Sequence, residues 1–495
     1  MEANTGNEMD SSFILTIADE LLDQILSHID LRVDLINFAC TSRVAASHII
    51  PRHLEYRVLK IGSPSPALWD HLASRPDLAL NVRAVAFTER RYSGEVALQR
   101  VPTSFTSDPH ISHHENAEEQ QSSNMIKAFR YMKNLQLFKC VRDQTPGLSP
   151  EQHTPDLLVA ILGNKPNLSQ LSVCGHFDRQ NILCDMAKLE NVDLNLSCLN
   201  MSLSRNSNES IQRKAINVYS WLHRSMSDLV YLGLSETEID TRFGDLVIPS
   251  LKSFAITTET PVGNIICKFI EQNPTIEDLS WFPHDPAQFT PGILPNLKRL
   301  RSNQTFLRAL EVAYHAAEPP VKYKVESFTA YFLPLKFILE LDCLNRPSLK
   351  QISAGDQADF FFDVLKQMAN DFPNIEVLKI PIGFCYGLSF NECYDLLPRF
   401  PNLQIVPFIP IDDPIDLNPN TEAIKEVIMR LARLCPKLQV LPAFGTSPSY
   451  GRRIVQLTRT PVDGQERIEF EFTETQRPNK TFEDYRALWR VDYMY

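Results

Sequence analysis

Glycine is scarce in this chain, with 16 glycines in 495 residues. In doubly wound nucleotide-binding enzymes, glycine-rich turns flank the strands. Neither the Rossmann glycine pattern nor G-x-x-x-x-G-K-[ST] occurs here. The patterns G-x-S-x-G and H-E-x-x-H are absent as well. We therefore expect a protein that is not an enzyme, although dispersed catalytic residues that converge only in the fold would escape such a search.

Positive charge and long apolar runs are also lacking. The chain has 49 Lys and Arg against 60 Asp and Glu, a net charge of −11, whereas binding to a nucleic-acid backbone needs clustered cations. No stretch reaches the roughly 18 apolar residues that cross a bilayer, and residues 1–12 show no basic and then apolar leader. We expect a cytoplasmic or nuclear protein that binds neither nucleic acid nor membrane.

Metal and disulfide patterns are missing too. The ten cysteines form no C-x-x-C pair and are spread through apolar runs, which is typical of small buried side chains. His110, His113, His114 and Glu115 are close in sequence, but they fall in a polar segment that offers no rigid geometry to a metal. We expect neither a metal nor a cofactor.

Residues 13–60 have the apolar spacing of three short helices. Asp19 is a suitable N-cap for the first helix, a second run covers residues 33–39, and a third extends from Val44 to Leu59 despite Pro51. The first helix has apolar residues on one face at Leu21, Leu22, Ile25, Leu26 and Ile29. Domains of this size are marginally stable alone, so we expect the module to have a partner.

This segment resembles an F-box, on the run Ile17-Ala18-Asp19-Glu20-Leu21-Leu22, then Ile25-Leu26, Leu31, Leu35 and Thr41-Ser42-Arg43. Family members usually have Leu-Pro at the first pair and an aromatic residue after the Arg, whereas Ala18 and Ala45 stand here. The resemblance implies docking on the Skp-type linker subunit of a cullin–RING ubiquitin ligase. It implies that the linker contacts are Ile17, Leu21, Leu22, Ile25, Leu26 and Leu31. The alternative is that all six form the core of a helical cap.

Two segments of different character follow the module. Residues 61–92 contain a linking helix and then Val82, Val85 and Phe87, which predict a first repeat-like strand. Residues 93–124 are rich in Ser, Glu, Gln and Pro without an apolar period, which predicts a mobile polar insertion.

Residues 125–445 repeat one sequence motif: a helix, a Pro or polar residue that ends it, and then Leu-x-x-Leu-x-Leu or a variant. Successive first positions lie between 21 residues (Leu168 to Leu189) and 40 residues (Leu189 to Leu229) apart, mostly near the period of leucine-rich repeats. The last two leucines of the motif lie on the same face of a strand, so neighbouring units must stack to bury them. The first positions, which we call anchors, are Leu135, Leu168, Leu189, Leu229, Leu251, Ile276, Leu297, Val325, Leu349, Ile375, Leu403 and Leu438.

The predicted fold is therefore α/β: a three-helix F-box-like module followed by a leucine-rich-repeat solenoid, with parallel strands on the concave face and helices on the convex face. Helical spacing is clearest over residues 211–226, 262–273, 306–317, 360–372 and 421–435. The stretch resembles the repeat region of F-box proteins but lacks the usual Asn after the strand. Residues 446–495 predict a cap, formed by a hairpin of residues 453–458 and 467–472 and a helix over 481–489.

The predicted concave face supplies the candidate target-binding residues Phe282, Arg299, Arg301 and Tyr331. Aromatic residues and Arg are enriched at interface hot spots, and paired arginines suit an acidic or phosphorylated segment. The alternative is that Arg299 and Arg301 pair with neighbouring acids on a solvated strand.

These observations give one main hypothesis, a substrate-recognition adaptor of an SCF-type ubiquitin ligase whose repeats bind a target protein. The second hypothesis is a leucine-rich-repeat scaffold without a ligase, and the third is an enzyme with an unrecognised site.

Overall fold

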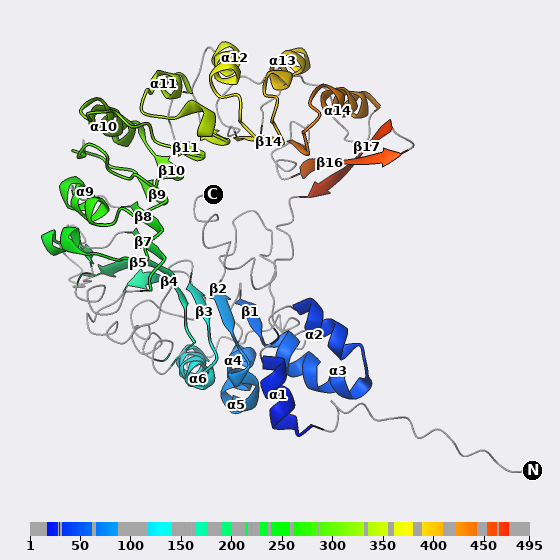
Figure 1. Cartoon of the computed structure of the whole chain (residues 1–495). Helices are drawn as coiled ribbons and strands as arrows, with labels where there is room; N and C mark the ends of the chain where they lie inside the picture. Colours follow the sequence, from blue (N-terminus) through cyan, green and yellow to red (C-terminus); the bar gives the residue numbers. More distant parts are fainter. Residues whose placement is uncertain are drawn as a thin grey trace, which may run out of the picture. The chain divides into compact units, whose positions relative to one another are not determined.

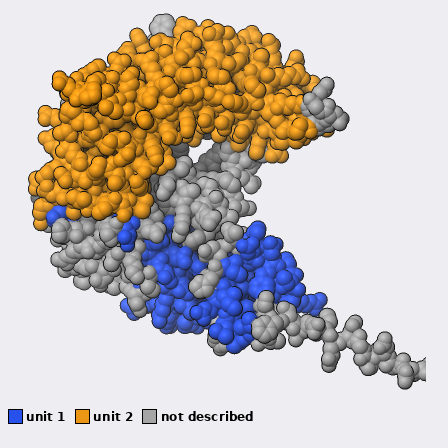
Figure 2. Space-filling model, in the orientation of Figure 1, with its two compact units in different colours: residues 1–229, 236–238, 479–495 blue, residues 230–235, 239–478 orange. Residues whose placement is uncertain are grey.

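The computed structural model divides the chain into two compact units (Figure 2). Unit 1 comprises residues 1–229, 236–238 and 479–495, and unit 2 comprises residues 230–235 and 239–478. The structure describes residues 17–27, 29, 32–61, 66–87, 117–140, 160, 165, 167–176, 191–199, 213–215, 219, 228–235, 239–257, 262–285, 287–330, 335–354, 361–379, 389–408, 422–442, 453–462 and 465–474.

Unit 1 begins with the expected helices and continues into a mainly parallel sheet (Figure 1). Its helical elements are α1 (Asp19–Ser27), α2 (Arg32–Ala39), α3 (Arg43–Ile49), η2 (Ile50–Glu55), α4 (Pro66–Ser74), α5 (Pro76–Leu80) and α6 (Ala117–Tyr131). Its parallel strands pair in chain order and are β1 (Val58–Ile61), β2 (Ala84–Phe87), β3 (Leu137–Cys140), β4 (Gln170–His176) and β5 (Asn191–Leu199).

The third helix of the module is shorter than predicted. It ends at Ile49 and continues as a π-helical turn, η2, because Pro51 has no N–H to donate to the preceding turn. Val58, Leu59 and Ile61 then form β1, although the apolar spacing predicted a helix as far as Leu59. Two of these three residues are β-branched and suit a strand, so the sheet starts one strand earlier than predicted.

Two further predictions for unit 1 need correction. The helix α6 starts at Ala117, inside the segment predicted to be a mobile insertion, because Ala, Glu and Gln extend a helix that Met125 and Phe129 anchor in the core. Residues 213–215, predicted to be helical, form β6 (Arg213–Ala215), which pairs antiparallel with β5. Sheet pairing overrides local helix propensity there. Residues 93–116 lie outside the described residues.

Unit 2 is a curved array of strand-and-helix units with strands on its inner side and helices on its outer side (Figure 1). The strands pair in parallel, in chain order, from β7 to β15. They are β7 (Tyr231–Ser235), β8 (Ser253–Thr257), β9 (Asp278–Trp281), β10 (Arg299–Ser302), β11 (Ser327–Ala330), β12 (Gln351–Ala354), β13 (Val377–Lys379), β14 (Ile405–Phe408) and β15 (Val440–Pro442).

The outer elements of unit 2 include the four remaining helices predicted from apolar spacing. The helical elements are η4 (Thr241–Asp245), α9 (Gly263–Gln272), α10 (Gln304–His315), α11 (Leu335–Glu340), η5 (Arg346–Ser348), α12 (Phe361–Asp371), α13 (Phe390–Leu396), η6 (Leu397–Arg399) and α14 (Glu422–Leu434). Pro274, Pro373 and Pro436 each follow a helix end by two residues, as predicted.

The repeat motif determines where each strand begins. Every anchor residue lies two positions before the first residue of a strand, from Leu135 before β3 to Leu438 before β15. The described anchors are at most 5% exposed, and the third residue after the anchor is equally buried, as at Leu232, Phe254 and Leu279. The predicted stacking of units around a shared apolar row is therefore confirmed.

The predicted C-terminal hairpin is also present. Strands β16 (Arg453–Val462) and β17 (Gln465–Glu474) pair antiparallel, and β16 pairs antiparallel with β15. Val455 and Leu457 are buried, so β16 covers the last parallel strand. The predicted helix over 481–489 lies outside the described residues.

Candidate functional site

The N-terminal module has its own small apolar core. Its buried members are Leu22, Leu26, Leu35, Ala39, Ala45 and Ile49, and Ile29, Phe38, Ala46 and Leu54 pack against them. Helix α3 starts at an N-cap, since the Ser42 side chain accepts a hydrogen bond from the Ala45 N–H at 3.0 Å. Short helices are thus held by shared burial and by a cap.

The same three helices expose large apolar side chains. On α1, Leu21 is 55% exposed and Ile25 is 49% exposed; on α2, Val33 is 61% exposed and Ile36 is 37% exposed. Residues three or four apart share one helix face, so α1 and α2 each present a pair. We call Leu21, Ile25, Val33, Ile36, Val44 and Ile50 the exposed apolar set of the module.

The structure separates the predicted linker contacts into two groups. Leu21 and Ile25 belong to the exposed apolar set, and Ile17 is half-buried. Leu22 and Leu26 are only 3% and 0% exposed, which matches the alternative that they belong to the core of the module. Consecutive helical residues point about 100° apart, and the sequence alone did not tell which apolar face turns inward. Leu31 lies outside the described residues.

The two alanines that depart from the F-box pattern occupy different environments. Ala45 is 1% exposed and belongs to the module core, whereas Ala18 is exposed just before α1. The side chain at position 45 therefore affects packing inside the module, and the one at position 18 affects the chain entering α1.

A polar contact ties η2 to α1. The Asp23 carboxylate accepts a hydrogen bond from Arg52 Nη1 at 2.9 Å, and its other oxygen lies 3.0 Å from His53 Nε2. His53 is 2% exposed. Burial lowers the pKa of its imidazole below the ordinary value of 6.5, and the hydrogen bond to Asp23 offsets this only in part.

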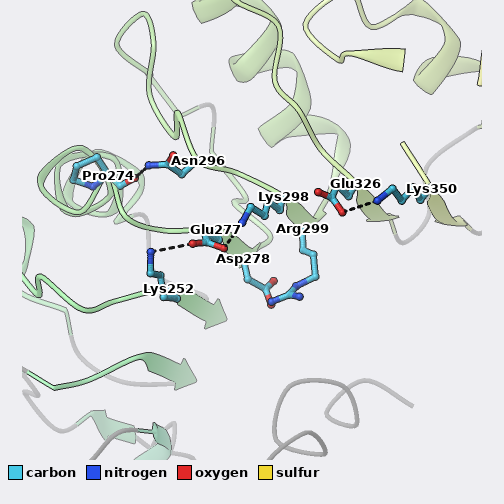
Figure 3. Close-up of polar contacts among 9 residues, drawn as sticks. All are labelled: Lys252, Pro274, Glu277, Asp278, Asn296, Lys298, Arg299, Glu326 and Lys350. Atoms are coloured by element: carbon cyan, nitrogen blue, oxygen red, sulfur yellow. Dashed lines mark hydrogen bonds and ion pairs between the residues drawn. The ribbon is translucent and has the colours of Figure 1, made fainter. Parts of the chain in front are cut away.

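The predicted concave residues of unit 2 are only partly brought together. Arg299 and Arg301 lie on β10, two residues apart, and therefore on the same side of the sheet. Arg299 Nε donates to Asp278 Oδ2 at 3.0 Å across to β9, which matches the alternative that it pairs with a neighbouring acid (Figure 3). Phe282 is half-buried just after β9, and Tyr331 lies outside the described residues.

Acidic side chains beside the strands are engaged in ion pairs between units. The Glu277 carboxylate bridges Lys252 at 2.9 Å and Lys298 at 2.8 Å, and Lys350 approaches Glu326 at 3.3 Å (Figure 3). The hydrogen bonds from Lys298 and Lys252 lower the pKa of Glu277 to about 2. Such a carboxylate stays ionised and is a poor proton donor at neutral pH.

The four cysteines that the structure describes as buried in unit 2 have thiols of low reactivity. Cys267, Cys343, Cys393 and Cys435 are buried, and burial raises the pKa of Cys267, Cys393 and Cys435 to about 12. A thiol in this state is a weak nucleophile at neutral pH. The prediction that cysteines act as buried apolar side chains is confirmed for these four, whereas Cys40 is exposed.

One cluster in unit 2 has metal-ligand chemistry. Glu311, His315 and Asp342 bring ligand atoms within 4.8 Å of one another. The Glu311 carboxylate already accepts hydrogen bonds from the backbone N–H groups of Asp342 and Cys343, both at 3.0 Å. These bonds attach the loop after α11 to α10, and they account for the position of Glu311. His110, His113, His114 and Glu115 lie outside the described residues.

Comparisons with known proteins give only a weak likeness to solved structures. No family model matches the chain, and no curated protein matches it. Among solved structures, it is similar to a chain of the yeast Rad7 and Elc1 complex, with 15% sequence identity and a TM-score of 0.40, over 69% of this chain and 83% of that chain. No helix in the described ranges is long and apolar enough to cross a membrane. A function for this chain must therefore be inferred from its own residues.

Proposed function

We propose that this chain is the substrate-recognition adaptor of an SCF-type ubiquitin ligase. In this proposal the N-terminal module is an F-box that docks on a Skp-type linker, and an irregular leucine-rich-repeat array binds a protein target. The observation that carries the proposal is the exposed apolar set on α1, α2 and the start of α3, at helices with the F-box order of residues.

Exposed apolar side chains on so small a module favour a protein partner. Burying apolar surface contributes roughly 25 cal/mol per Å², and large exposed apolar patches commonly mark interaction sites. The module's own core uses Leu22, Leu26 and Leu35, so Leu21, Ile25 and Val33 stay available without unfolding it.

The repeat units support the second half of the proposal. Their strands present polar and charged residues on the inner side of unit 2, such as Ser280, Arg301 and Thr329, and curved repeat arrays commonly bind proteins on that side. The adaptor would catalyse nothing itself. Its contribution would be to raise the effective concentration of target lysines beside the ubiquitin-charged partner.

Recovery of a purified Skp-type linker on the immobilised full chain tests the docking. We expect the double substitution Leu21→Asp with Ile25→Asp to weaken recovery by at least about tenfold, because it places two charges in an apolar contact. Gln367→Asp with Asn370→Asp adds the same two charges at exposed positions of α12 in the repeat array, and this matched control should bind as the wild type does.

A second pair of variants separates contact from folding. Leu26→Ala removes a fully buried side chain and should cost about 2–5 kcal/mol of module stability. Leu21→Ala should cost little stability but should still weaken binding of the linker. Equal recovery by wild type and Leu21→Asp/Ile25→Asp, or no recovery by either, would contradict the ligase proposal. The chain would then be a repeat scaffold with a helical N-terminal cap.

A further inference from the structure

Three side chains of metal-ligand chemistry meet between two consecutive repeat units of unit 2. Glu311 and His315 lie on α10, four residues apart and therefore on one helix face, and Asp342 lies in the loop after α11. One ligand atom from each side chain lies within 4.8 Å of the other two. We call these residues the 311–342 cluster. Both helices belong to the outer side of unit 2, so the cluster is separate from the strand face (Figure 1).

Main-chain hydrogen bonds hold Glu311 and the loop in place. Oε1 of Glu311 accepts from the Asp342 N–H and Oε2 accepts from the Cys343 N–H, both at 3.0 Å. The Tyr323 N–H donates to the Cys343 carbonyl at 2.8 Å, and the Asn345 N–H donates to the Tyr323 carbonyl at 2.9 Å. Hydrogen bonds from outside a metal site orient its ligands in this way. The carboxylate of Glu311 and the main chain of Asp342 are therefore preorganised.

The spacing of Glu311 and His315 fits a single ion. Oε1 of Glu311 and Nε2 of His315 are 3.0 Å apart. Two ligand atoms that each lie about 2.1 Å from a zinc ion are roughly 3.0–3.4 Å apart. Oε1 can therefore keep its bond from the Asp342 N–H and exchange its contact with the imidazole for the ion. Asp342 is exposed, so its side chain can rotate to bring the third ligand atom closer.

The negative charge of the cluster is not balanced as it is elsewhere between the units. Within the described ranges, Glu311 forms an ion-pair contact only with His315, and Asp342 forms none. Glu277, in contrast, bridges two lysines of neighbouring units. In a chain with a net charge of −11, a divalent cation bound here would neutralise both carboxylates of the cluster.

The mixture of one imidazole and two carboxylates selects the class of metal. Calcium and magnesium prefer ligand sets made of oxygen, whereas zinc and related transition-metal ions bind imidazole nitrogen together with carboxylate oxygen. Three protein ligands leave room for water on the ion, and the His315 side chain is 60% exposed on that solvent side.

We infer that the 311–342 cluster binds a zinc-class divalent ion, which clamps α10 to the loop after α11 and so joins two consecutive repeat units. The inference is independent of the proposed function. It departs from the expectation of no metal, which rested on the cysteines and on residues 110–115. A Glu and a His four residues apart on a helix were the sequence signal, but only the fold brings Asp342 to them.

Hydrogen exchange of the full chain with and without zinc tests the inference. The amides of Asp342 and Cys343 donate to Glu311, so an opening that exposes these amides also breaks the site. About 100 µM free zinc, which is about 100 times a micromolar dissociation constant, should slow exchange of the peptide 341–345 by at least about tenfold. Zinc bound elsewhere, for instance at the exposed Cys40, does not protect this peptide. Unchanged exchange in zinc would overturn the inference.

Magnesium separates a metal site from a general attraction of cations to acidic groups. At the same concentration it should leave exchange of the peptide 341–345 unchanged, because it does not favour an imidazole ligand. Equal protection by magnesium and zinc would mean that the cluster attracts any divalent cation, and the inference would be wrong.

Substitutions assign the protection to the cluster. His315→Gln and Asp342→Asn each remove a ligand at an exposed position, and Gln at position 315 keeps a group that donates to Glu311. Both variants should exchange as the wild type does without zinc and should lose the slowing in zinc. His284→Gln, which removes an exposed histidine from the loop after β9, is the matched control and should keep it. Slowing that survives in His315→Gln, or that disappears in His284→Gln, would overturn the inference.

Discussion

Leu21 and Leu22 are neighbours in sequence with opposite environments, 55% and 3% exposed. Both are apolar and both fit the helical period, so the pattern does not distinguish the face that packs on α2 and α3 from the face that remains exposed. Only the position of Leu35 and Ile49 in the shared core decides this. The apolar pattern therefore identified the helix but did not separate its exposed residues from its core residues.

The stability of the N-terminal module should depend on pH through His53. Its pKa is lowered in the folded chain, so the unfolded chain binds a proton first as pH falls. Stability should be full above about pH 6.5 and should decrease as pH falls below this value until the folded imidazole is also protonated. Hydrogen exchange of residues 19–55, corrected for intrinsic rates at about pH 7.5 and 5.5, measures the opening free energy. In His53→Gln the component of this pH dependence that comes from the imidazole should disappear; an unchanged dependence would contradict this role.

Glu277 should contribute to stability as an ion. Its folded pKa of about 2 is below the ordinary 4.5, so its contribution is present above about pH 4.5 and is lost as pH falls toward 2. Glu277→Gln should lower stability at neutral pH by no more than about 1 kcal/mol, since the pairs are partly exposed. Urea unfolding of both proteins should show this difference shrinking below pH 4.5. Glu326→Gln, which has one lysine partner at 3.3 Å, is the matched control and should lose less.

Asparagine side chains join consecutive repeat units ahead of their strands. Each lies one residue before an anchor and donates to the carbonyl of a proline in the preceding unit: Asn296 to Pro274 at 2.9 Å, Asn374 to Pro347 at 2.8 Å, and Asn402 to Pro373 at 3.2 Å. Figure 3 shows the first of these bonds. The units lack the Asn that usually follows the strand in such repeats, but a Pro-Asn pair recurs before the anchor and is the sequence signal for this asparagine ladder.

Removing one ladder residue should loosen the C-terminal units. Asn402 donates to Pro373 and to Asn374, and its Oδ1 accepts from Lys437 Nζ at 2.6 Å, so Asn402→Ala breaks contacts on both sides. We expect a loss of about 1–2 kcal/mol in urea unfolding. Asn370→Ala, at an exposed position of α12, should change stability by less than about 0.5 kcal/mol. Equal effects at the two positions would contradict the ladder's role.

Some elements have local sequence signals other than apolar spacing. Helix α13 opens with a capping box, in which the Ser389 and Glu392 side chains bond each other's backbone N–H groups. In contrast, β6 has no such signal, because Arg213, Lys214 and Ala215 become a strand only by pairing with β5. Local chemistry predicts caps, whereas strand pairing depends on residues distant in sequence.

A repeat array leaves its last strand without a partner, and unit 2 closes this edge with the β16–β17 hairpin. Arg459 strengthens the closure, since its Nη2 donates to the carbonyl of Ala432 at 2.6 Å and to that of Cys435 at 3.1 Å. The outer strand β17 carries Glu466, Glu469 and Glu471 at exposed positions. Charges along an edge strand discourage pairing between molecules.

Opening this cap should make the protein self-associate. Val455→Asp places a charge at a fully buried position of β16, which should detach the hairpin and expose the edge of β15. We expect a rise in apparent mass by light scattering at unchanged concentration. Gln456→Asp adds the same charge at the exposed neighbouring position and should leave the protein monodisperse. A monodisperse Val455→Asp protein that remains folded would contradict the capping role.

The sequence by itself determined the order of elements in this protein. Its anchors place the parallel strands β3 to β5 and β7 to β15 to the residue, because each of these units repeats one local pattern whose apolar row must be buried. The tertiary structure decided which residues are available for binding. Leu22 packs in the module core, and Arg299 pairs with Asp278. The register from β10 to β13 aligns Lys379 with Arg301. These outcomes depend on register and on which helix face packs inward, and both are set by contacts between residues far apart in the chain.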